Sequence, residues 1–366
     1  MFPSSNNNPV TVLVTGGCGF IGSHLVRLIL RDRPNWEIVN VDLLTYAGNP
    51  ENIADIEVVQ DPSRYRFVKA DIADAQGINE LFDSEHIGAV INLAAETHVD
   101  RSLLDSAPFL RTNIEGVRVL LEAATRHKVS RFVQVSTDEV YGSLEPTDAP
   151  FKESSSLRPN SPYAASKAGA DLLARSYHSS FSLPVLVTRC GNNYGPYQFP
   201  EKFLPLFITN ALDDQPLPLY GDGQNIRDWI HVEDHVRALL RVLEEGAPGK
   251  IYNIGVGQQA TNRVMAERIL SIINKPQSLI HYVKDRPGHD RRYALNTAKI
   301  TNELGWESLI SLEAGLQTTV DWYRDHRGWW EKIKGAEYQN HYRQWYSERL
   351  GDAVKSAQGS ILTKTS

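Results

Sequence analysis

The sequence predicts an α/β protein in which a doubly wound parallel sheet is followed by a smaller, mixed α/β C-terminal domain. Two observations lead to this fold class. In the first half of the chain, short runs rich in β-branched residues alternate with longer helical patterns, and the runs are apolar on both faces. This alternation is typical of a parallel sheet covered by helices on both sides. After Gly191 prolines crowd the chain and the predicted elements become short and mixed, which indicates a second domain.

The elements follow in order along the chain. The predicted strands are Val10–Thr15, Ile38–Asp42, Tyr65–Lys69, Ala89–Leu93, Arg131–Ser136 and Val185–Thr188. The helical patterns between them lie at about 20–31, 75–85, 103–127 and 163–181. The aromatic-rich segment Trp322–Tyr346 is expected to pack a C-terminal helix onto the body of the protein.

The same patterns predict how the domains divide. We expect residues 9–190 to form the first domain and residues 191–350 to form mainly the second, with the chain returning to the first sheet around 225–260. The two ends, 1–8 and 352–366, are polar and are expected to be disordered.

The composition excludes several classes of function. The 366 residues carry a net charge of −6, whereas nucleic-acid binding needs a basic surface. No apolar run is long enough to span a bilayer, and the start MFPSSNNNP lacks the pattern of a signal peptide. The two cysteines, Cys18 and Cys190, stand in glycine-containing turns and not in a spaced framework, which fits a reducing compartment. We therefore expect a cytoplasmic protein that binds neither nucleic acid nor membrane.

A glycine-rich turn predicts a dinucleotide site. The segment TGGCGFIG (15–22) follows the first strand and opens a helix. Glycines at Gly16, Gly19 and Gly22 let the backbone turn tightly and approach a pyrophosphate, whose charge the helix N-terminus favours. A tight strand–helix turn without a ligand is the alternative for this segment taken alone. Its place after the first strand favours a Rossmann-like domain.

Acidic residues at the next two strand ends strengthen this prediction. Asp42 ends the second strand, where a carboxylate accepts hydrogen bonds from an adenosine ribose. A carboxylate there repels a 2′-phosphate, so NAD is favoured over NADP. Asp71 and Ile72 follow the third strand and could flank the adenine, although an ordinary strand-end turn also explains them.

Two further groups of residues predict proton and hydride chemistry. Tyr163 and Lys167 stand four residues apart and therefore share one face of a helix. A lysine ammonium near the phenol, together with a positive nicotinamide, is expected to lower the pKa of Tyr163, which could then take a proton from a sugar hydroxyl. Thr137, Asp138 and Glu139 follow the fifth strand, and two carboxyls in different environments can divide the acid and base roles of a water elimination. An N-cap of a short helix is the alternative for the two acids.

The glycine loop, Asp42 and the Tyr163–Lys167 pair resemble the extended short-chain dehydrogenase/reductase superfamily. Five longer segments, in this order and at this spacing, resemble the dTDP-glucose 4,6-dehydratase family from about residue 10 to about residue 325. They are STDEVYG (136–142), YAASK (163–167), RCGNNYGPYQFPEKFLPL (189–206), YGDGQNIRDWIHVEDH (220–235) and DRPGHDRRY (285–293).

The resemblance implies a role for each catalytic residue. Thr137 would bond the sugar 4-oxygen, Asp138 would protonate the 6-hydroxyl, and Glu139 would be the base at C5. Tyr163 would be the base of the first oxidation, with Lys167 as its partner on the cofactor side. The implied reaction is the NAD-dependent dehydration of dTDP-glucose to dTDP-4-keto-6-deoxyglucose, by C4 oxidation, loss of water across C5–C6 and hydride return to C6. A UDP-glucose 4,6-dehydratase and a nucleotide-sugar 4-epimerase remain the alternatives.

Together with the motifs, the resemblance also implies the two sets of binding residues. The NAD contacts are Gly16, Gly19, Phe20, Ile21, Gly22, Asp42, Thr45, Asp71, Ile72, Leu93, Ala94, Ala95, Thr112, Tyr163, Lys167 and Asn193. The substrate contacts are Thr97, Thr137, Asn192, Lys202, Phe203, Pro218, Tyr220, Arg227, Asn262, Arg286 and His289. Arg227 and Arg286 are also candidates from their chemistry, because an acidic chain needs local guanidinium groups to hold a diphosphate. We expect no metal, since no histidine has the spacing of a ligand. The resemblance further implies a homodimer, in which helix 103–127 and the Tyr163 helix form a four-helix interface.

Overall fold

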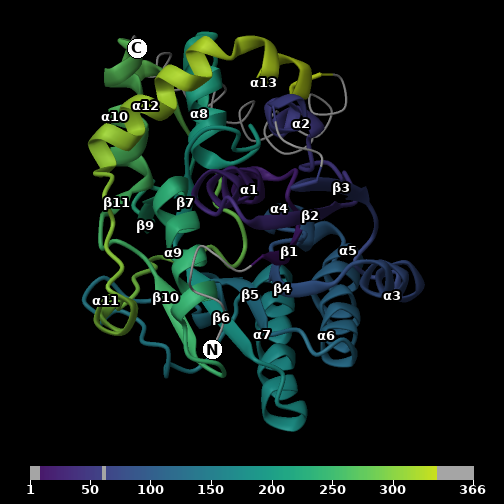
Figure 1. Cartoon of the computed structure of the whole chain (residues 1–366). Helices are drawn as coiled ribbons and strands as arrows, with labels where there is room; N and C mark the ends of the chain where they lie inside the picture. The colour runs from purple at the N-terminus through teal and green to yellow at the C-terminus, as the bar shows by residue number, and fades with distance from the viewer. Residues whose placement is uncertain (1–8, 60–62, 336–366) are drawn as a thin grey trace, which may run out of the picture.

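A central parallel sheet organises the molecule. The computed structural model describes residues 9–59 and 63–335. Its seven strands lie in the order β10-β6-β5-β4-β1-β2-β3, and every neighbouring pair is parallel (Figure 1). The strands are β1 (Val10–Thr15), β2 (Trp36–Asp42), β3 (Tyr65–Lys69), β4 (Ile87–Asn92), β5 (Arg131–Thr137), β6 (Val185–Cys190) and β10 (Ile251–Ile254). The strand order reverses between β1 and β4, which makes the crevice at their carboxyl ends the expected ligand site of a doubly wound sheet.

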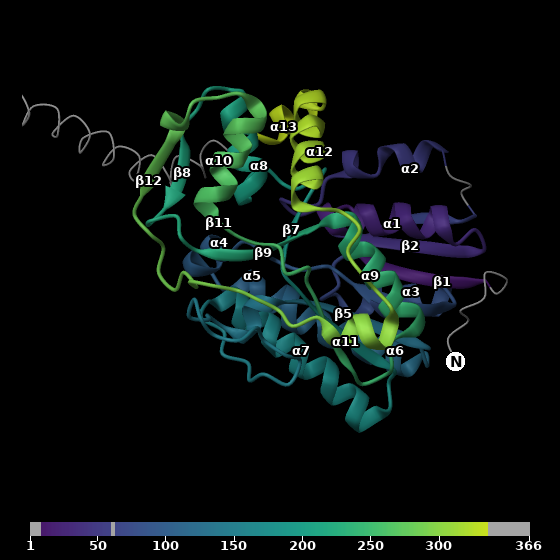
Figure 2. The same cartoon turned by 90° about the vertical axis from the view of Figure 1, so that its left-hand side faces the viewer.

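Helices cover both faces of this sheet, as its apolar strands require (Figures 1 and 2). On one face, α1 (Phe20–Asp32) packs against α9 (Val232–Glu245), and α11 (Ala298–Leu304) joins the same buried core. On the other face, α3 (Ala75–Ser84), α6 (Val117–Arg126) and α7 (Pro162–Phe181) enclose a second buried core. The predicted α/β fold with a doubly wound parallel sheet is confirmed.

A smaller region with its own hydrophobic core lies beyond the carboxyl ends of the strands. Its strands are β7 (Asn192–Tyr194), β8 (Leu217–Tyr220), β9 (Ile226–His231), β11 (Gln259–Thr261) and β12 (Ile280–Val283), which form a three-stranded and a two-stranded sheet. Its helices are α8 (Phe203–Leu212), α10 (Asn262–Ile273), α12 (Leu312–Asp325) and α13 (Arg327–Ile333). Buried residues of these helices pack against Trp229 of β9. The mixed α/β character predicted for this part of the chain is confirmed.

One predicted helix is wrong in its start and in its continuity. The pattern at 103–127 is divided into α4 (Val99–Leu104), α5 (Ala107–Leu110), a π-helical turn (Arg111–Gly116) and α6. Asp105, which follows α4, is extended at φ −143° and ψ 113°. Pro108 lies in the first turn of α5, where a missing amide hydrogen is tolerated, whereas in a continuous helix it would remove a hydrogen bond and clash with the preceding turn.

The other deviations are small. Strands β2, β4, β5 and β6 begin or end one or two residues from the predicted bounds, and the short helix α2 (Ala54–Val59) has no predicted counterpart. Trp322 lies in α12, and the buried Trp329 and Trp330 of α13 join the second region's core, so this part of the aromatic segment packs on the body as predicted. Residues 336–346, and the ends 1–8 and 352–366, lie outside the described residues.

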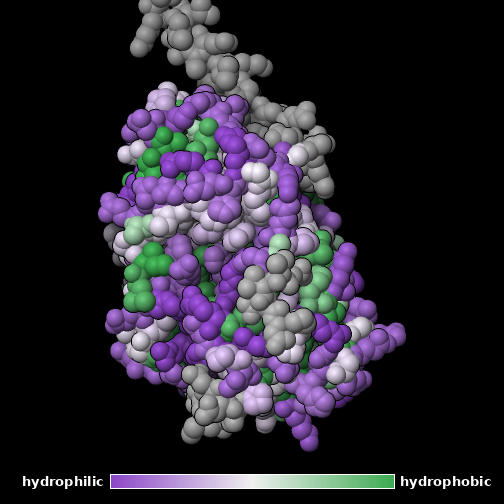
Figure 3. Space-filling model, turned by 45° about the horizontal axis from the view of Figure 1, so that its top comes forward, coloured by the Kyte–Doolittle hydropathy of each residue, from purple (hydrophilic) through white to green (hydrophobic). Residues whose placement is uncertain are grey.

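One face of the described part is mainly polar. The face drawn in Figure 3 is covered largely by hydrophilic residues, with hydrophobic residues in separate small groups. Among the described residues, no helix has the length and apolar character needed to cross a bilayer.

Candidate active site

A cavity of about 320 Å³ lies at the carboxyl ends of β1, β2, β4, β5 and β6. This is the position that the reversal of strand order predicts for a ligand. Every residue predicted to contact NAD lies on its wall. They are Gly16, Gly19, Phe20, Ile21, Gly22, Asp42, Thr45, Asp71, Ile72, Leu93, Ala94, Ala95, Thr112, Tyr163, Lys167 and Asn193.

The glycine loop between β1 and α1 leaves no room for side chains. Gly16 has a φ of +72°, and a Cβ there would lie 2.8 Å from the backbone nitrogen of Ala94. A Cβ on Gly22 would lie 2.1 Å from the carbonyl oxygen of Gly16. Helix α1 begins at Phe20 without a side-chain cap, so its first N–H groups remain available beside the cavity. A bare helix N-terminus behind a loop of closely packed glycines fits a pyrophosphate.

Asp42 ties the glycine loop to the end of β2. Its Oδ2 accepts a hydrogen bond from the backbone N–H of Cys18 at 3.0 Å, and its Oδ1 accepts one from Leu44 at 2.8 Å. Burial raises the pKa of this carboxyl, and the two backbone donors oppose that shift. Asp71 makes the ordinary strand-end turn that was the alternative, since its Oδ1 accepts from Ala73 N at 2.8 Å, but it also lines the cavity.

Tyr163 and Lys167 lie in the first two turns of α7, buried on the cavity wall. The expected lowering of the pKa of Tyr163 is wrong for the protein groups alone. Burial raises the pKa of this phenol, the charges of Glu139 and Asp138 raise it further, and a hydrogen bond with Thr137 opposes them. The Nζ of Lys167 donates to the carbonyl of Val135 at 2.7 Å, and burial lowers the pKa of this ammonium to about 8.

The two acids after β5 have different surroundings. Thr137 caps the short 3₁₀ helix Asp138–Tyr141, so a helix follows as in the alternative interpretation, but neither acid is its cap. Asp138 is 2% exposed, and its Oδ2 has no hydrogen-bond partner among the described residues. Burial and the adjacent Glu139 raise the pKa of Asp138 well above its usual range. Burial raises the pKa of Glu139 as well, but Arg286, Arg227 and Lys202 oppose that shift.

The predicted substrate residues fall into two groups. Thr97, Thr137, Asn192 and Lys202 line the cavity together with the NAD set. The others do not lie on this cavity wall: Phe203, Pro218, Tyr220, Arg227, Asn262, Arg286 and His289.

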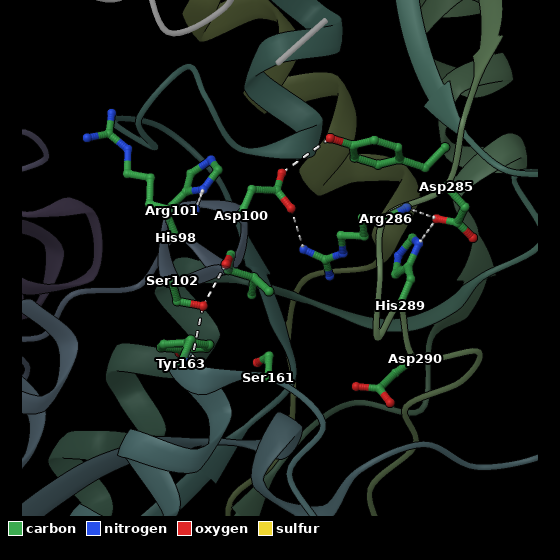
Figure 4. Close-up of polar contacts among 12 residues, drawn as sticks. His98, Asp100, Arg101, Ser102, Ser161, Tyr163, Asp285, Arg286, His289 and Asp290 are labelled. Atoms are coloured by element: carbon green, nitrogen blue, oxygen red, sulfur yellow. Dashed lines mark hydrogen bonds and ion pairs between the residues drawn. The ribbon is translucent and has the colours of Figure 1, made fainter. Parts of the chain in front are cut away.

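Most of the second group lies beyond Glu139, in the smaller region. Arg227 donates to the carbonyl of Asp290 at 3.0 Å and stacks over Tyr293, and Arg286 pairs with Asp100 at 3.3 Å. His289 lies against Asp285 at 2.6 Å (Figure 4). Both arginines lower the pKa of Glu139, so the two guanidinium groups lie within electrostatic reach of this carboxyl.

The remaining three predicted substrate residues lie in helices and strands of the smaller region. Phe203 begins α8 and packs near Trp229, and Pro218 lies within β8. Asn262 begins α10, and its backbone N–H donates to Asn225.

Sequence reasoning missed several residues on the cavity wall. Glu96, Gln198, Phe199 and His235 line it, although no role in binding or catalysis was predicted for any of them. The nitrogen Nδ1 of His235 lies 2.8 Å from Oδ1 of Asn193. The signal was present, because three of the four fall within the long segments 189–206 and 220–235 that carry the resemblance.

Comparison with known proteins agrees with this geometry. The family model described as GDP-mannose 4,6 dehydratase matches residues 13–319. A curated dTDP-glucose 4,6-dehydratase of Streptomyces griseus is 51% identical over 89% of this chain and 97% of its own length. That of Neisseria meningitidis is 47% identical over 93% of this chain and 98% of its own length.

The chain belongs to the dTDP-glucose 4,6-dehydratase family. Among solved structures, this family member is similar to DesIV of Streptomyces venezuelae, a dTDP-glucose 4,6-dehydratase with NAD bound. The TM-score is 0.85 at 50% identity, over 89% of this chain and all of DesIV. The UDP-glucose 4-epimerase of Thermotoga maritima shares the fold at a TM-score of 0.80 but at 31% identity, over 86% of this chain and 99% of its own. The dehydratase is therefore supported over the epimerase that the sequence left open.

Proposed function

We propose that this protein dehydrates dTDP-glucose to dTDP-4-keto-6-deoxyglucose with NAD as its cofactor. The observation that carries the proposal is the pair Asp138 and Glu139, adjacent in the chain but held in different electrostatic environments beside Tyr163. An elimination of water needs an acid and a base at neighbouring carbons. An epimerase has no evident use for this pair.

The cavity supports a role for the bound cofactor. We propose that the first N–H groups of α1 hold the pyrophosphate and that Asp42 bonds the adenosine ribose. When bound, NAD would supply the positive nicotinamide ring, the acceptor of hydride from C4 and the donor of hydride to C6.

Tyr163 is proposed as the base of the oxidation step. It would remove the proton of the sugar 4-hydroxyl, with Thr137 bonded to both the phenol and the 4-oxygen. Because burial raises the pKa of Tyr163, the phenol would have to lose its proton under the influence of the positive nicotinamide and of Lys167 before it can act as this base. Lys167 keeps a cation on the same face of α7.

Asp138 and Glu139 are proposed to divide the elimination. Burial and Glu139 keep Asp138 protonated, so it can give a proton to the departing 6-hydroxyl, which leaves as water. Glu139 faces three cations that favour its ionised form, so it can remove the proton from C5, exchange it with solvent, and later deliver a solvent proton to C5. The 4-ketone formed first is what makes that C5 proton acidic.

Substrate binding is proposed to involve both groups of predicted residues. Arg227 and Arg286 would hold the diphosphate, with Lys202, Thr97 and Asn192 closer to the sugar. The roles of Phe203, Pro218, Tyr220, Asn262 and His289 in binding the nucleotide remain proposals. We also propose that residues 9–190 form an NAD-binding domain and that residues 191–350 form a domain that mainly binds the nucleotide sugar.

We also propose a cytoplasmic homodimer. Of the large hydrophobic side chains that are exposed in the described residues, several lie on α4, α5 and α7. They are Leu103, Leu104, Leu110, Leu172 and Phe181. A set of apolar side chains on neighbouring helices is typical of an interface between subunits. Two reduced, buried cysteines fit a reducing compartment.

The reaction is tested by incubating the protein with dTDP-glucose in deuterated water. The expected product is the 4-keto-6-deoxy sugar with solvent deuterium at C5, seen by mass spectrometry and NMR. Recovery of dTDP-galactose instead would overturn the dehydratase in favour of the epimerase. A parallel reaction with UDP-glucose tests the base, and equal rates on both nucleotide sugars would remove the specificity for dTDP.

A further inference from the structure

Helix α4 carries three consecutive polar residues, Asp100, Arg101 and Ser102, whose side chains contact three different parts of the site. This six-residue helix follows the cavity-lining end of β4. Figure 4 shows the side chain of Asp100 directed toward Arg286, whereas that of Ser102 is directed toward Tyr163. None of the three residues lies on the cavity wall.

Asp100 joins two of the predicted substrate residues. Its Oδ1 accepts from Nη1 of Arg286 at 3.3 Å, and its Oδ2 accepts from the hydroxyl of Tyr220 at 3.2 Å. The Asp100 side chain is 7% exposed, so this ion pair is shielded from water. Arg286 keeps donors free for a ligand, because its buried Nε has no hydrogen-bond partner among the described residues. Asp100 thus fixes one edge of the guanidinium and leaves another available.

Ser102 joins α4 to the helix of the proposed catalytic base. Its Oγ accepts from the backbone N–H of Tyr163 at 3.2 Å and donates to the carbonyl of Val99 at 2.6 Å. Helix α7 begins with Pro162, which has no N–H, and Ser161 caps only Ala164. The N–H of Tyr163 therefore depends on Ser102, because a buried donor without a partner is costly.

Arg101 holds α4 in place from a third side. Its guanidinium donates to the Oε2 of Glu201 at 3.2 Å and lies 4.0 Å over the ring of Tyr46. His98, the N-cap of α4, lies 3.7 Å from the same Glu201 oxygen. With this anchor the helix has little freedom to shift, so the contacts of Asp100 and Ser102 are fixed relative to each other.

We propose that α4 is a positioning element that sets two parts of the site independently, the phosphate-binding guanidinium of Arg286 through Asp100 and the phenol of Tyr163 through Ser102. The proposal rests on the functions proposed above for Arg286, Tyr220 and Tyr163. Asp100 and Ser102 act only through these residues.

The test is a pair of substitutions in one helix whose kinetic effects separate. Asp100→Asn keeps the shape but removes the ion pair, and is expected to raise KM for dTDP-glucose by about tenfold while kcat stays within about twofold. Ser102→Ala is expected to lower kcat by about tenfold with little change in KM. The matched controls are Asp105→Asn and Ser106→Ala, both exposed, and each should leave both constants unchanged. The side-chain oxygen of asparagine can still accept the hydrogen bond that Ala107 N–H donates to Asp105. Ser106 makes no side-chain cap hydrogen bond, so its replacement by alanine removes none.

Direct binding of dTDP to the NAD-loaded enzyme, measured by calorimetry, tests the Asp100 branch without turnover. Asp100→Asn should weaken binding by about the same factor as it raises KM. Tyr220→Phe should weaken binding less, and the loss in the double variant should be smaller than the sum of the two single losses, because the hydroxyl and the carboxylate are bonded to each other. Non-additivity of this kind does not arise from general destabilisation.

Three outcomes would overturn the proposal. Tighter dTDP binding in Asp100→Asn would show that Asp100 only competes with phosphate for Arg286. Parallel losses of kcat and raised KM in both variants would make α4 a structural helix. Changes in kcat or KM of the same size in the controls Asp105→Asn and Ser106→Ala would lead to the same conclusion. Failure of the proposed function is distinguishable, because then the wild-type enzyme itself would form no 4-keto-6-deoxy sugar.

Discussion

Two carboxyls adjacent in the chain behave differently at the scale of single residues. Asp138 is buried, and one of its oxygens has no hydrogen-bond partner within the described part of the chain, whereas Glu139 is partly exposed and faces Arg286 and Arg227. Burial raises the pKa of both carboxyls, but the charge of Glu139 adds to the rise for Asp138, whereas Arg286, Arg227 and Lys202 oppose it for Glu139. The sequence could name both acids, but only the structure separates their surroundings, because the cations come from segments distant in the chain.

Glu139→Gln should separate oxidation from dehydration. The variant keeps Tyr163 and is expected to form reduced nicotinamide from dTDP-glucose, seen by its near-ultraviolet absorbance. Loss of the base should slow water loss by at least about 100-fold and prevent deuterium entry at C5. Glu145→Gln, an exposed acid in the following loop, is the control and should dehydrate at the normal rate. Normal dehydration by Glu139→Gln would exclude Glu139 as the base.

Asp138→Asn should lower activity but increase stability, more so at high pH. The folded-state pKa of Asp138 is raised above its unfolded value, so its contribution to stability is present below the unfolded pKa and is lost as the pH rises toward the folded pKa. The gain in Tm of the variant over wild type should therefore be larger at pH 8 than at pH 5. The protein free of dTDP-sugar serves for both measurements.

Asp55→Asn is a control of opposite sign. Burial would raise the pKa of Asp55, but the hydrogen bond and charge of Arg27 lower it overall. Its contribution to stability is present above the unfolded pKa and lost as the pH falls below it, so this variant should lose more Tm at pH 5 than at pH 3, and about as much at pH 8 as at pH 5. The same sign for both variants would show that Asp138 is not held protonated.

At the scale of elements, local patterns were predictable and contacts between distant segments were not. The buried strands β1 and β5 follow from their β-branched runs, and the glycine loop follows from its spacing. The helix break before Pro108 was not predicted, because the apolar periodicity of the sequence continues across it. The partner of Asp100 is 186 residues away, so no spacing in the chain predicts that contact.

Gly22→Ala should break the glycine loop. The added methyl would lie 2.1 Å from the carbonyl oxygen of Gly16, and the backbone must move to accommodate it. The expected cost is about 1–3 kcal/mol of unfolding free energy, together with loss of NAD from the purified protein. Gly328→Ala in α13 is the control, since a Cβ there meets nothing within 4 Å. It should keep its NAD, and retention by Gly22→Ala would contradict a pyrophosphate site at this loop.

At the scale of the whole molecule, the exposed apolar residues of α5 and α7 predict its assembly. The double variant Leu110→Glu and Leu172→Glu places charges where a four-helix interface would exclude water, and should reduce the mass in solution from that of two chains to that of one. Light scattering after size exclusion measures this. Leu309→Glu, whose leucine is 76% exposed and precedes α12, is the control and should leave the mass unchanged. An unchanged mass in the double variant would place the interface elsewhere.

The strand β10 has a consequence for how such enzymes can change. The chain leaves the large sheet after β6, enters the smaller region at β7 and β9, and comes back through α9 to place β10 at the sheet edge before leaving again (Figure 2). A fragment cut at residue 190 would lack α9, whose buried face covers α1, as well as the edge strand. Neither region is therefore one continuous segment of the chain that could be replaced by the corresponding segment of another protein. A change of substrate would therefore have to be made in loops and side chains while both regions stay together.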